Sequence, residues 1–326
     1  MTMLSNTKVS IVLASYNGEK FIRQQLYSLM VQTFSDFVCY IHDDGSSDDT
    51  VRIIKDTIKE DDRFTLIEDG LTFGHPGSNF LHLLKFVNTE FCCFCDQDDL
   101  WLDTKLERLY SQIVRDINET EQREQNKPIM LIGNAYIWDY NKNNIFGRSA
   151  LYFPYEIKDY LFLNGGIQGA STIFNKACYP YLLNKLDIDI LHDQYLSLIA
   201  LTFGRVFSID EPLMLYRQHE GNWTFAAAGT FKNKYKNLTK SNAPVVFASI
   251  YNAVDCFYRK YEQEITNCTT KHCFQSYLKM RGYSNIDRFF SILSNRYTLY
   301  GSKIKLIIKI LCRPYFGKNA DRKSVV

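Results

Sequence analysis

The alternation of strands and helices over the first 135 residues constrains the fold more than any other feature of this sequence. Short apolar runs rich in β-forming residues are separated by segments whose apolar residues recur at helical spacing. The predicted strands are Val9–Ala14, Phe37–His42, Phe64–Ile67 and Phe91–Cys95, and the predicted helices cover residues 22–30, 51–58, 78–87 and 103–117. This order predicts an α/β fold in which a mostly parallel central sheet carries helices on both faces.

The composition indicates a folded protein of a reducing compartment. Hydrophobic residues make up 46% of the 326 residues, which is too many for general disorder. The cluster Cys92, Cys93 and Cys95 lies in a predicted buried strand without a second set of ligands, so we interpret it as buried free thiols. The polar N-terminus does not resemble a signal peptide, and no apolar stretch reaches the ~18 residues of a membrane span. We therefore expect a cytoplasmic protein.

The composition changes near Thr224, where lysines begin to alternate with aromatic residues and strand–helix units end. We therefore predict one α/β domain over residues 1–224 and a helical, basic C-terminal region over residues 225–326. Within a predicted helix at Lys303–Arg313, the basic residues Lys305, Lys309 and Arg313 lie four apart on one stripe. Such a helix either lies on an anionic membrane surface or packs on the first domain with solvated lysines. No nucleic-acid-binding module accompanies the charge, so we expect no nucleic-acid partner.

Polar and acidic residues follow three of the predicted strands. The three segments are Ala14-Ser15-Tyr16-Asn17-Gly18, His42-Asp43-Asp44-Gly45-Ser46 and Asp96-Gln97-Asp98-Asp99. Ligands of parallel sheets bind at the carboxyl edge of the strands, where these segments would meet. Clustered carboxylates repel each other unless they share a cation, and Mg²⁺ or Mn²⁺ holding a diphosphate suits such a site. Each segment alone is equally typical of turns and helix caps, so the prediction depends on their conjunction.

These segments resemble the nucleotide-sugar domain of family 2 glycosyltransferases, in particular the bacterial rhamnosyltransferase-like branch of surface-polysaccharide biosynthesis. The resemblance is carried by VSIVLASYNGEKFIRQQLYSLMVQTF, HDDGSSDDTVRII and CDQDDLWLDTKLERL, and by Leu191–Asn222 on the acceptor side. It implies a Rossmann-like GT-A fold and an inverting, Mn²⁺- or Mg²⁺-dependent transfer from a nucleotide-diphosphate sugar, UDP or dTDP in particular. The implied acceptor is a lipid-linked saccharide of O-antigen or capsule biosynthesis, reached at the inner face of the cell membrane.

The resemblance also implies a role for each matching residue. Asp193 matches the catalytic base, although an N-cap of the helix that runs to Phe203 explains it from the sequence alone. Asp98 and His219 match metal ligands, and Arg217 would offset phosphate charge. The implied nucleotide-sugar site comprises Ala14, Ser15, Tyr16, Asn17, Asp43, Asp44, Asn79, Asp96 and Gln97. The implied acceptor side comprises Asp99, Trp101, Gly166 and Gln168, with core packing an equal alternative for Trp101.

Three other functions remain open at this point. A nucleotidyltransferase would carry a glycine-rich basic loop after its first strand, where this chain has only Gly18. A dinucleotide-dependent oxidoreductase would need a G-x-G-x-x-G segment. A non-catalytic nucleotide-sugar-binding protein would not need Asp98 and Asp193. One departure from the resemblance concerns the donor, because Ser78 stands where many relatives carry a lysine.

Overall fold

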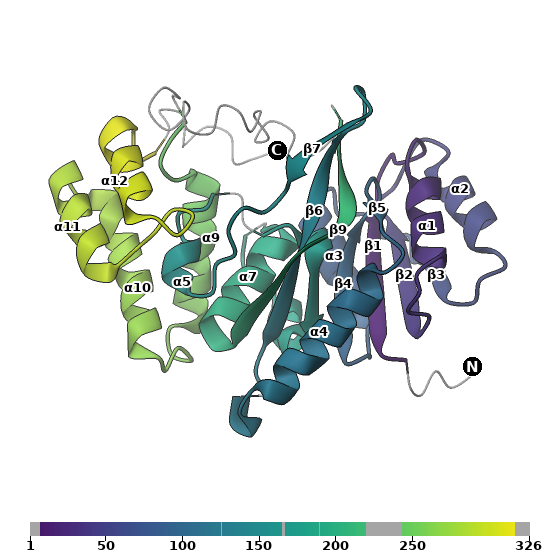
Figure 1. Cartoon of the computed structure of the whole chain (residues 1–326), viewed down its shortest axis with the longest axis horizontal. Helices are drawn as coiled ribbons and strands as arrows, with labels where there is room; N and C mark the ends of the chain where they lie inside the picture. The colour runs from purple at the N-terminus through teal and green to yellow at the C-terminus, as the bar shows by residue number, and fades with distance from the viewer. Residues whose placement is uncertain (1–6, 125, 165–166, 189, 220–242, 317–326) are drawn as a thin grey trace. The chain divides into compact units, whose positions relative to one another are not determined.

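The computed structural model describes residues 7–124, 126–164, 167–188, 190–219 and 243–316 (Figure 1). Its internal contacts divide the chain into two compact units. The first unit comprises residues 1–150, 167–185 and 189–220, and the second comprises 151–166, 186–188 and 221–326. The predicted domain boundary at residue 224 lies outside the described residues.

The first unit is built on one sheet of nine described strands in the order β3-β2-β1-β4-β8-β6-β9-β5, with β7 paired to β6. The strands are β1 (Val9–Ser15), β2 (Phe37–Asp43), β3 (Phe64–Ile67), β4 (Phe91–Asp96), β5 (Leu100–Trp101), β6 (Ile129–Asp139), β7 (Asn144–Arg148), β8 (Thr172–Asn175) and β9 (Arg205–Gln218). Strands β1 to β4 pair in parallel, and β6 pairs in parallel with β9. Strand β8 runs antiparallel between β4 and β6. The predicted α/β class is confirmed.

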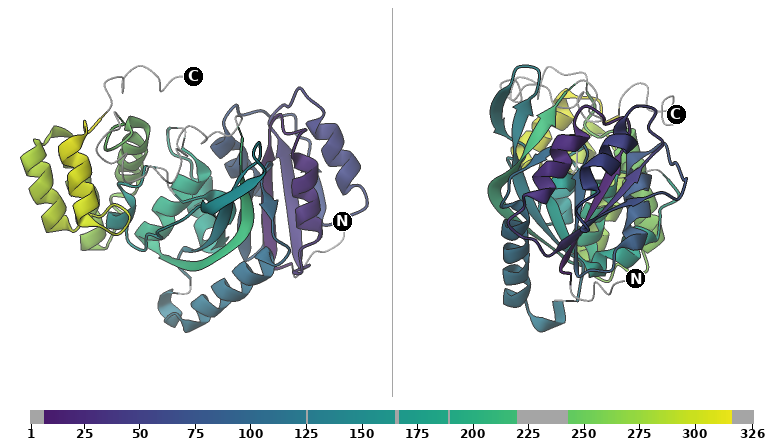
Figure 2. Two further views of the ribbon diagram at one scale, coloured as in Figure 1. Left: turned by 45° about the horizontal axis from the view of Figure 1, so that its top comes forward. Right: turned by 90° about the vertical axis from the view of Figure 1, so that its right-hand side faces the viewer.

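Helices pack on this sheet through amphipathic faces (Figure 2). They are α1 (Ile22–Met30), α2 (Thr50–Ile58), α3 (Pro76–Leu83), α4 (Lys105–Glu119), α6 (Tyr179–Leu183) and α7 (His192–Phe203). Helix α4 illustrates the pattern, because Leu106, Leu109 and Ile113 lie on one side of it and are fully buried. Helix α1 packs beside α2, whereas α3 packs beside α6 and α7.

The strand order reverses at β1, and this reversal positions the candidate site. The chain adds β2 and β3 on one side of β1 and then β4 on the other. The register places Ala14 opposite both His42 and Asp96, and Ser15 opposite Asp43. The three polar segments predicted from the sequence therefore meet at one edge of the sheet, at the kind of reversal where α/β proteins bind ligands. Upstream of this edge, Cys93 of β4 is buried as predicted, and its burial raises the pKa of its thiol to about 12.

The second unit is helical in its described residues. Its helices are α5 (Ile157–Tyr160), α9 (Ala248–Tyr261), α10 (Cys268–Lys279), α11 (Asn285–Asn295) and α12 (Lys303–Cys312). Aromatic side chains form its core, where the ring of Phe162 lies 5.3 Å from that of Tyr277 and 5.4 Å from that of Tyr297. Ser284 caps α11 in a capping box with Asp287. Among the described residues, no helix has the length and apolar character needed to cross a bilayer.

The prediction of a basic stripe on the last helix is wrong for Lys309, whereas Lys305 and Arg313 are partly exposed. Lys309 of α12 is buried, and its ammonium group donates a hydrogen bond of 2.9 Å to the carbonyl of Val245. Burial lowers the pKa of Lys309 to about 8, with the nearby Arg313 as a second cause. The outward side of α12 instead carries apolar residues, among them Ile304 and Leu311. The sequence spacing was correct, but the carbonyl that binds Lys309 lies far away in the sequence.

Candidate active site

The end of β2 presents a carboxylate that its neighbours hold in one orientation. Oδ1 of Asp43 accepts hydrogen bonds from the hydroxyls of Ser15 at 2.9 Å and Ser46 at 2.6 Å. Its Oδ2 accepts from the backbone N–H groups of Ser46 at 2.7 Å and Gly45 at 3.2 Å. These four donors come from two strand ends, so Asp43 is oriented before any ligand binds.

The loop after β1 is fastened to the loops after β2 and β4. Asn17 has a left-handed backbone (φ 47°), and its N–H donates to the Ser46 hydroxyl at 2.7 Å. Gln97 exchanges two hydrogen bonds with the backbone of Tyr16, at 2.9 and 2.8 Å. A Cβ atom on Gly18 would lie 2.1 Å from the side-chain oxygen of Gln97, so this clamp requires glycine. The Tyr16 ring itself is exposed beside the clamp.

Asp44 and Asn79 support the same edge from neighbouring elements. A carboxylate oxygen of Asp44 accepts a hydrogen bond from the backbone N–H of Phe73, which lies in the loop after β3. Asn79 of α3 is buried, and its amide oxygen accepts a hydrogen bond of 2.7 Å from Nδ1 of His42. The structure therefore places Asn79 beneath the strand end, with its amide engaged by His42 rather than exposed for a ligand.

One three-residue group of metal-type ligands lies next to this edge. The Asp69 carboxylate sits between two imidazoles, 3.3 Å from Nε2 of His42 and 2.7 Å from Nε2 of His82. Its ligand atoms lie within 4.8 Å of one another, and among the described residues no other such three-residue group is found. The contacts of this carboxylate with the two imidazoles connect β2, α3 and the loop after β3.

The loop after β4 brings together the two predicted metal ligands. Nε2 of His219, at the end of β9, lies 2.8 Å from Oδ2 of Asp98. Asp96 precedes them at the end of β4, and burial raises its pKa, with further contributions from the charges of Asp98 and Asp193. This carboxylate and imidazole contact each other directly, and together they offer an oxygen and a nitrogen of the kinds that divalent cations bind.

Arg217 supports this loop from inside the protein. Its guanidinium is buried against the rings of Trp138 at 4.4 Å and Phe21 at 4.5 Å. Its Nε donates a hydrogen bond of 2.6 Å to the carbonyl of Asp98, and another nitrogen donates to Gln24 at 2.8 Å. From the resemblance we expected Arg217 to offset phosphate charge. The structure corrects this, because a side chain that is 0% exposed holds the loop and does not reach its surface.

Asp99 and Trp101 are also buried, which argues against their predicted contact with the acceptor. Asp99 accepts a hydrogen bond of 3.2 Å from the backbone N–H of Arg217, and burial raises its pKa well above the usual range. Trp101 packs under the buried Lys105, whose ammonium lies 3.5 Å from the indole ring and donates to the carbonyl of Ala170 at 2.5 Å. Core packing is therefore the correct reading of Trp101.

The last candidate is the carboxylate of Asp193, the second residue of α7. Leu191 is the N-cap of this helix, so the alternative reading of Asp193 as the cap is excluded. Burial raises the pKa of Asp193 to about 7, although backbone N–H groups of Gln194 and Gly169 partly oppose the shift. A Cβ atom on Gly169 would lie 3.1 Å from Cβ of Asp193 and 2.6 Å from Nε2 of His192. The glycine therefore lets the loop before β8 approach the carboxylate closely.

Gln168 lies beside this glycine, and neither polar atom of its side chain has a hydrogen-bond partner among the described residues. Both atoms are buried, and a buried polar group without a partner is uncommon in a folded protein. Gly166, the other predicted acceptor-side residue of this loop, lies outside the described residues.

Sequence reasoning missed several supporting residues. Lys105 and His192 are buried and Gln24 is exposed, but all three contact segments that are distant in the sequence, and no local pattern marks them. His192 is enclosed by the rings of Phe80 at 3.9 Å and Phe94 at 4.4 Å, and its burial lowers its pKa to about 3. It therefore stays neutral next to Asp193. Its place before Asp193 at a helix start was the one available signal.

Comparison with known proteins identifies the class of this fold. A solved structure of S. aureus TarS, residues 1–349 in complex with UDP-GlcNAc, superposes with a TM-score of 0.56 at 16% identity, covering 86% of this chain and 75% of TarS. At this identity the similarity concerns the fold alone, and it confirms the predicted GT-A fold with helices in the C-terminal part.

The sequence comparisons identify the family. The model of Glycosyl transferase family 2 matches residues 10–120. A dTDP-rhamnosyl transferase, RfbG of Shigella flexneri, is 31% identical over 238 residues, which is 69% of this chain and 78% of the relative. A UDP-Glc:alpha-D-GlcNAc-diphosphoundecaprenol beta-1,3-glucosyltransferase, WfgD of Escherichia coli, is 26% identical over 71% of this chain and 83% of the relative. The chain belongs to glycosyl transferase family 2 and is a glycosyltransferase.

Proposed function

We propose that this glycosyltransferase moves a sugar from a UDP or dTDP donor to a hydroxyl of a lipid-linked saccharide in surface-polysaccharide biosynthesis, with inversion at the anomeric carbon. The observation that carries the proposal is the meeting of Asp98, His219 and Asp96 with the desolvated Asp193, whose charge raises the pKa of Asp96. The two relatives support the donor and acceptor classes, since one is named for dTDP-rhamnose and the other for UDP-glucose and a diphosphoundecaprenol-linked sugar.

In this proposal Asp193 is the general base. A carboxylate with a pKa of about 7 is ionised in half of the molecules at neutral pH and still accepts a proton well. It takes the proton of the acceptor hydroxyl while the hydroxyl oxygen bonds to the anomeric carbon. The bond from that carbon to the donor diphosphate breaks on the opposite face, so one displacement inverts the configuration. The nucleotide diphosphate leaves.

Asp98 and His219 would hold a divalent cation, Mn²⁺ or Mg²⁺, whose charge would offset that of the leaving diphosphate. The assignment is supported by the direct contact of the two side chains, which brings both possible ligand atoms to one place next to Asp96. Asp43 and the loop of Ser15 to Asn17 would bind the nucleotide, because their side chains and backbone are already fixed at the sheet edge. On the acceptor side, Gln168 offers an amide next to the base.

The proposal is tested by a thermal-shift and turnover screen of the full chain with UDP-, dTDP- and GDP-sugars, each with Mn²⁺ or with EDTA. We expect one nucleotide class to stabilise the protein in a metal-dependent way. Asp98→Ala should abolish this stabilisation. Asp69→Asn, which removes the central carboxylate of the other group of metal-type ligands, should retain it.

Two outcomes would contradict the proposal. Stabilisation of equal size in EDTA would show that donor binding does not use a cation. No stabilisation and no turnover with any nucleotide sugar, in a protein that unfolds cooperatively, would remove the donor site itself.

A further inference from the structure

The second unit exposes an apolar surface on two neighbouring helices. Helices α11 and α12 pack against each other and lie side by side in Figures 1 and 2. Each carries three large exposed apolar residues at positions i, i+4 and i+7, which share one helix face. These residues are Ile286, Phe290 and Leu293 of α11 and Ile304, Ile308 and Leu311 of α12. Ile304 is 70% exposed and Ile286 is 69% exposed. We call these six residues the apolar face.

The apolar face differs from the side of each helix that packs inside the second unit. Ile292 of α11 and Leu306 and Ile310 of α12 are buried and supply the packing side. Lys309 also turns inward, toward the carbonyl of Val245. The helices are therefore apolar on two sides, and the outer side is larger than the scattered exposed residues that a water-soluble protein normally shows.

The stretch of chain that forms this surface is rich in basic residues. From Lys279 to Phe316 the sequence contains one acidic residue, Asp287, and its carboxylate is bonded to Ser284 in the cap of α11. Over the same span the exposed or partly exposed basic residues are Lys279, Arg281, Arg288, Arg296, Lys303, Lys305 and Arg313. An apolar patch with this border suits a partner that is apolar inside and negatively charged at its surface.

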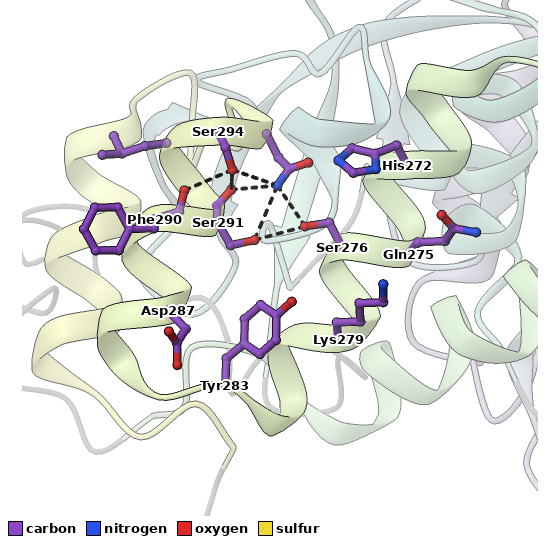
Figure 3. A pocket seen from close by; sticks show the side chains of 11 residues that line it. His272, Gln275, Ser276, Lys279, Tyr283, Asp287, Phe290, Ser291 and Ser294 are labelled. Carbon is purple, nitrogen blue, oxygen red and sulfur yellow. Dashed lines mark hydrogen bonds between the residues drawn. The ribbon is translucent and has the colours of Figure 1, made fainter.

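A groove with both polar and apolar lining residues adjoins the apolar face. It has a volume of about 730 Å³ between α10 and α11, and Figure 3 shows the side chains that line it. Phe290 and Leu293 of the apolar face line one part of this groove, and His272, Lys279 and Tyr283 line another. Polar side chains therefore lie directly beside apolar ones. Proteins that insert an apolar surface into a membrane have such an arrangement, in which the polar groups stay at headgroup level.

We propose that the apolar face of α11 and α12 docks on an anionic lipid bilayer and inserts its six side chains into the boundary between headgroups and acyl chains. This deepens the proposed function, on which it rests for its purpose, because a lipid-linked acceptor lies in such a bilayer. The contact differs from the basic stripe expected from the sequence: apolar residues enter the membrane, and lysines and arginines contact the headgroups around them.

A second copy of the chain fits this surface less well than a bilayer does. Two such faces brought together would place their basic borders against each other, and like charges at a contact repel. The described part of the border offers only Asp287 to offset this repulsion.

The test is flotation of the full chain with vesicles of phosphatidylcholine alone or with 30% phosphatidylglycerol. We expect binding to the anionic vesicles. The double variant F290S/I304S should reduce the partition coefficient about tenfold or more, because two large apolar groups no longer leave water. V31S is the matched control, because Val31 is 63% exposed in the first unit, and it should bind like the wild type. K303Q should weaken binding about fivefold, and added salt should remove that difference.

Insertion is measured independently with an environment-sensitive thiol label. Cys312, next to Leu311, and Cys268, at the start of α10, are both exposed. In variants that leave one of them as the accessible thiol, the label at Cys312 should gain fluorescence with anionic vesicles and the label at Cys268 should not.

Two results overturn the proposal: no flotation of the wild type, or equal flotation of F290S/I304S. Dimers in the ultracentrifuge that F290S/I304S dissociates, without vesicle binding, would assign the face to a second copy.

Turnover with a water-soluble acceptor separates this proposal from the proposed function. F290S/I304S should retain that turnover, because none of its changes lies in the first unit. Membrane binding without any transferase activity would leave the docking surface standing and remove the proposed reaction. Activity without membrane binding would support the proposed reaction and remove the docking surface.

Discussion

The loop around Asp43 and the cluster around Asp193 both present carboxylates in the first unit, but they differ in what surrounds those carboxylates. Asp43 accepts four hydrogen bonds from Ser15, Gly45 and Ser46. Asp193 also accepts from backbone N–H groups, but the effect of burial is larger, and its pKa rises to about 7. The hydrogen bonds around Asp43 hold its carboxylate in one orientation, to which a ligand can bind. The burial of Asp193 raises the proton affinity of its carboxylate.

The same comparison explains why the two regions tolerate change differently. A change near Asp43 removes hydrogen bonds that are each worth about 1 kcal/mol net, so its effect is graded. A change at Asp193 removes the proton acceptor, so its effect falls on the chemical step. The following variants separate these two behaviours.

The largest effect is expected for Asp193→Asn, which keeps the shape of the side chain and removes its basicity. The turnover number should fall about 10²- to 10⁴-fold, the range that general base catalysis supplies. The donor dissociation constant, measured by calorimetry, should change little. The melting temperature should not fall. Burial destabilises the ionised carboxylate, and the neutral amide that replaces it does not have this cost. Turnover at the wild-type rate would remove Asp193 from the mechanism.

Gly169→Ala should give the next largest effect. The new methyl group would meet Nε2 of His192 at 2.6 Å and Cβ of Asp193 at 3.1 Å, so the base must shift. A displacement approaching 1 Å at a reacting group costs up to about 10²-fold in rate. Gly282→Ala is the control, since a Cβ atom there meets nothing within 4 Å and should leave turnover unchanged. Unaltered kinetics in Gly169→Ala would show that the base does not depend on this approach.

The pH dependence of turnover tests the raised pKa of Asp193 directly. Only ionised Asp193 accepts a proton, and its pKa of about 7 means that the ionised fraction falls as the pH drops through 7. The rate constant kcat/KM should therefore lie about tenfold below its plateau at pH 6 and level off above about pH 8. The residual rate of Asp193→Asn should lack this limb. A wild-type profile that is flat from pH 6 to 8 would contradict the raised pKa.

The sequence predicted the α/β framework and the meeting of the strand ends well, because both depend on local patterns. Strand β3 was predicted at its observed bounds, Phe64–Ile67, from one apolar run. The polar ends of β1, β2 and β4 met because parallel strands share one carboxyl edge. Asp98 and His219 were paired through the resemblance, and the structure brings them to 2.8 Å.

The side-chain directions could not be predicted in the same way. Arg217, Asp99 and Trp101 lie next to functional segments, yet all three are buried, because segments distant in the sequence pack over them. Lys309 illustrates the same limit in the second unit, where a carbonyl 64 residues away turns it inward. Spacing along a helix defines a stripe, but whether that stripe faces water depends on tertiary contacts.

The smallest effect is expected for Gln97→Met, which tests the region of fixed shape. The change keeps the length of the side chain and removes both hydrogen bonds to Tyr16. Water can replace these partners because the clamp is exposed, so the free energy of unfolding in urea should fall by only about 1 kcal/mol. Donor affinity should fall about threefold, with kcat almost unchanged, because the loop after β1 becomes less ordered while Asp193 is untouched. Gln112→Met, which removes one hydrogen bond to Asp116 on α4, controls for the substitution and should leave donor affinity unchanged. Unaltered donor affinity in Gln97→Met would mean that the bonds of Asn17 and Ser46 alone hold the loop, and that the Gln97 clamp stabilises the fold without shaping the site.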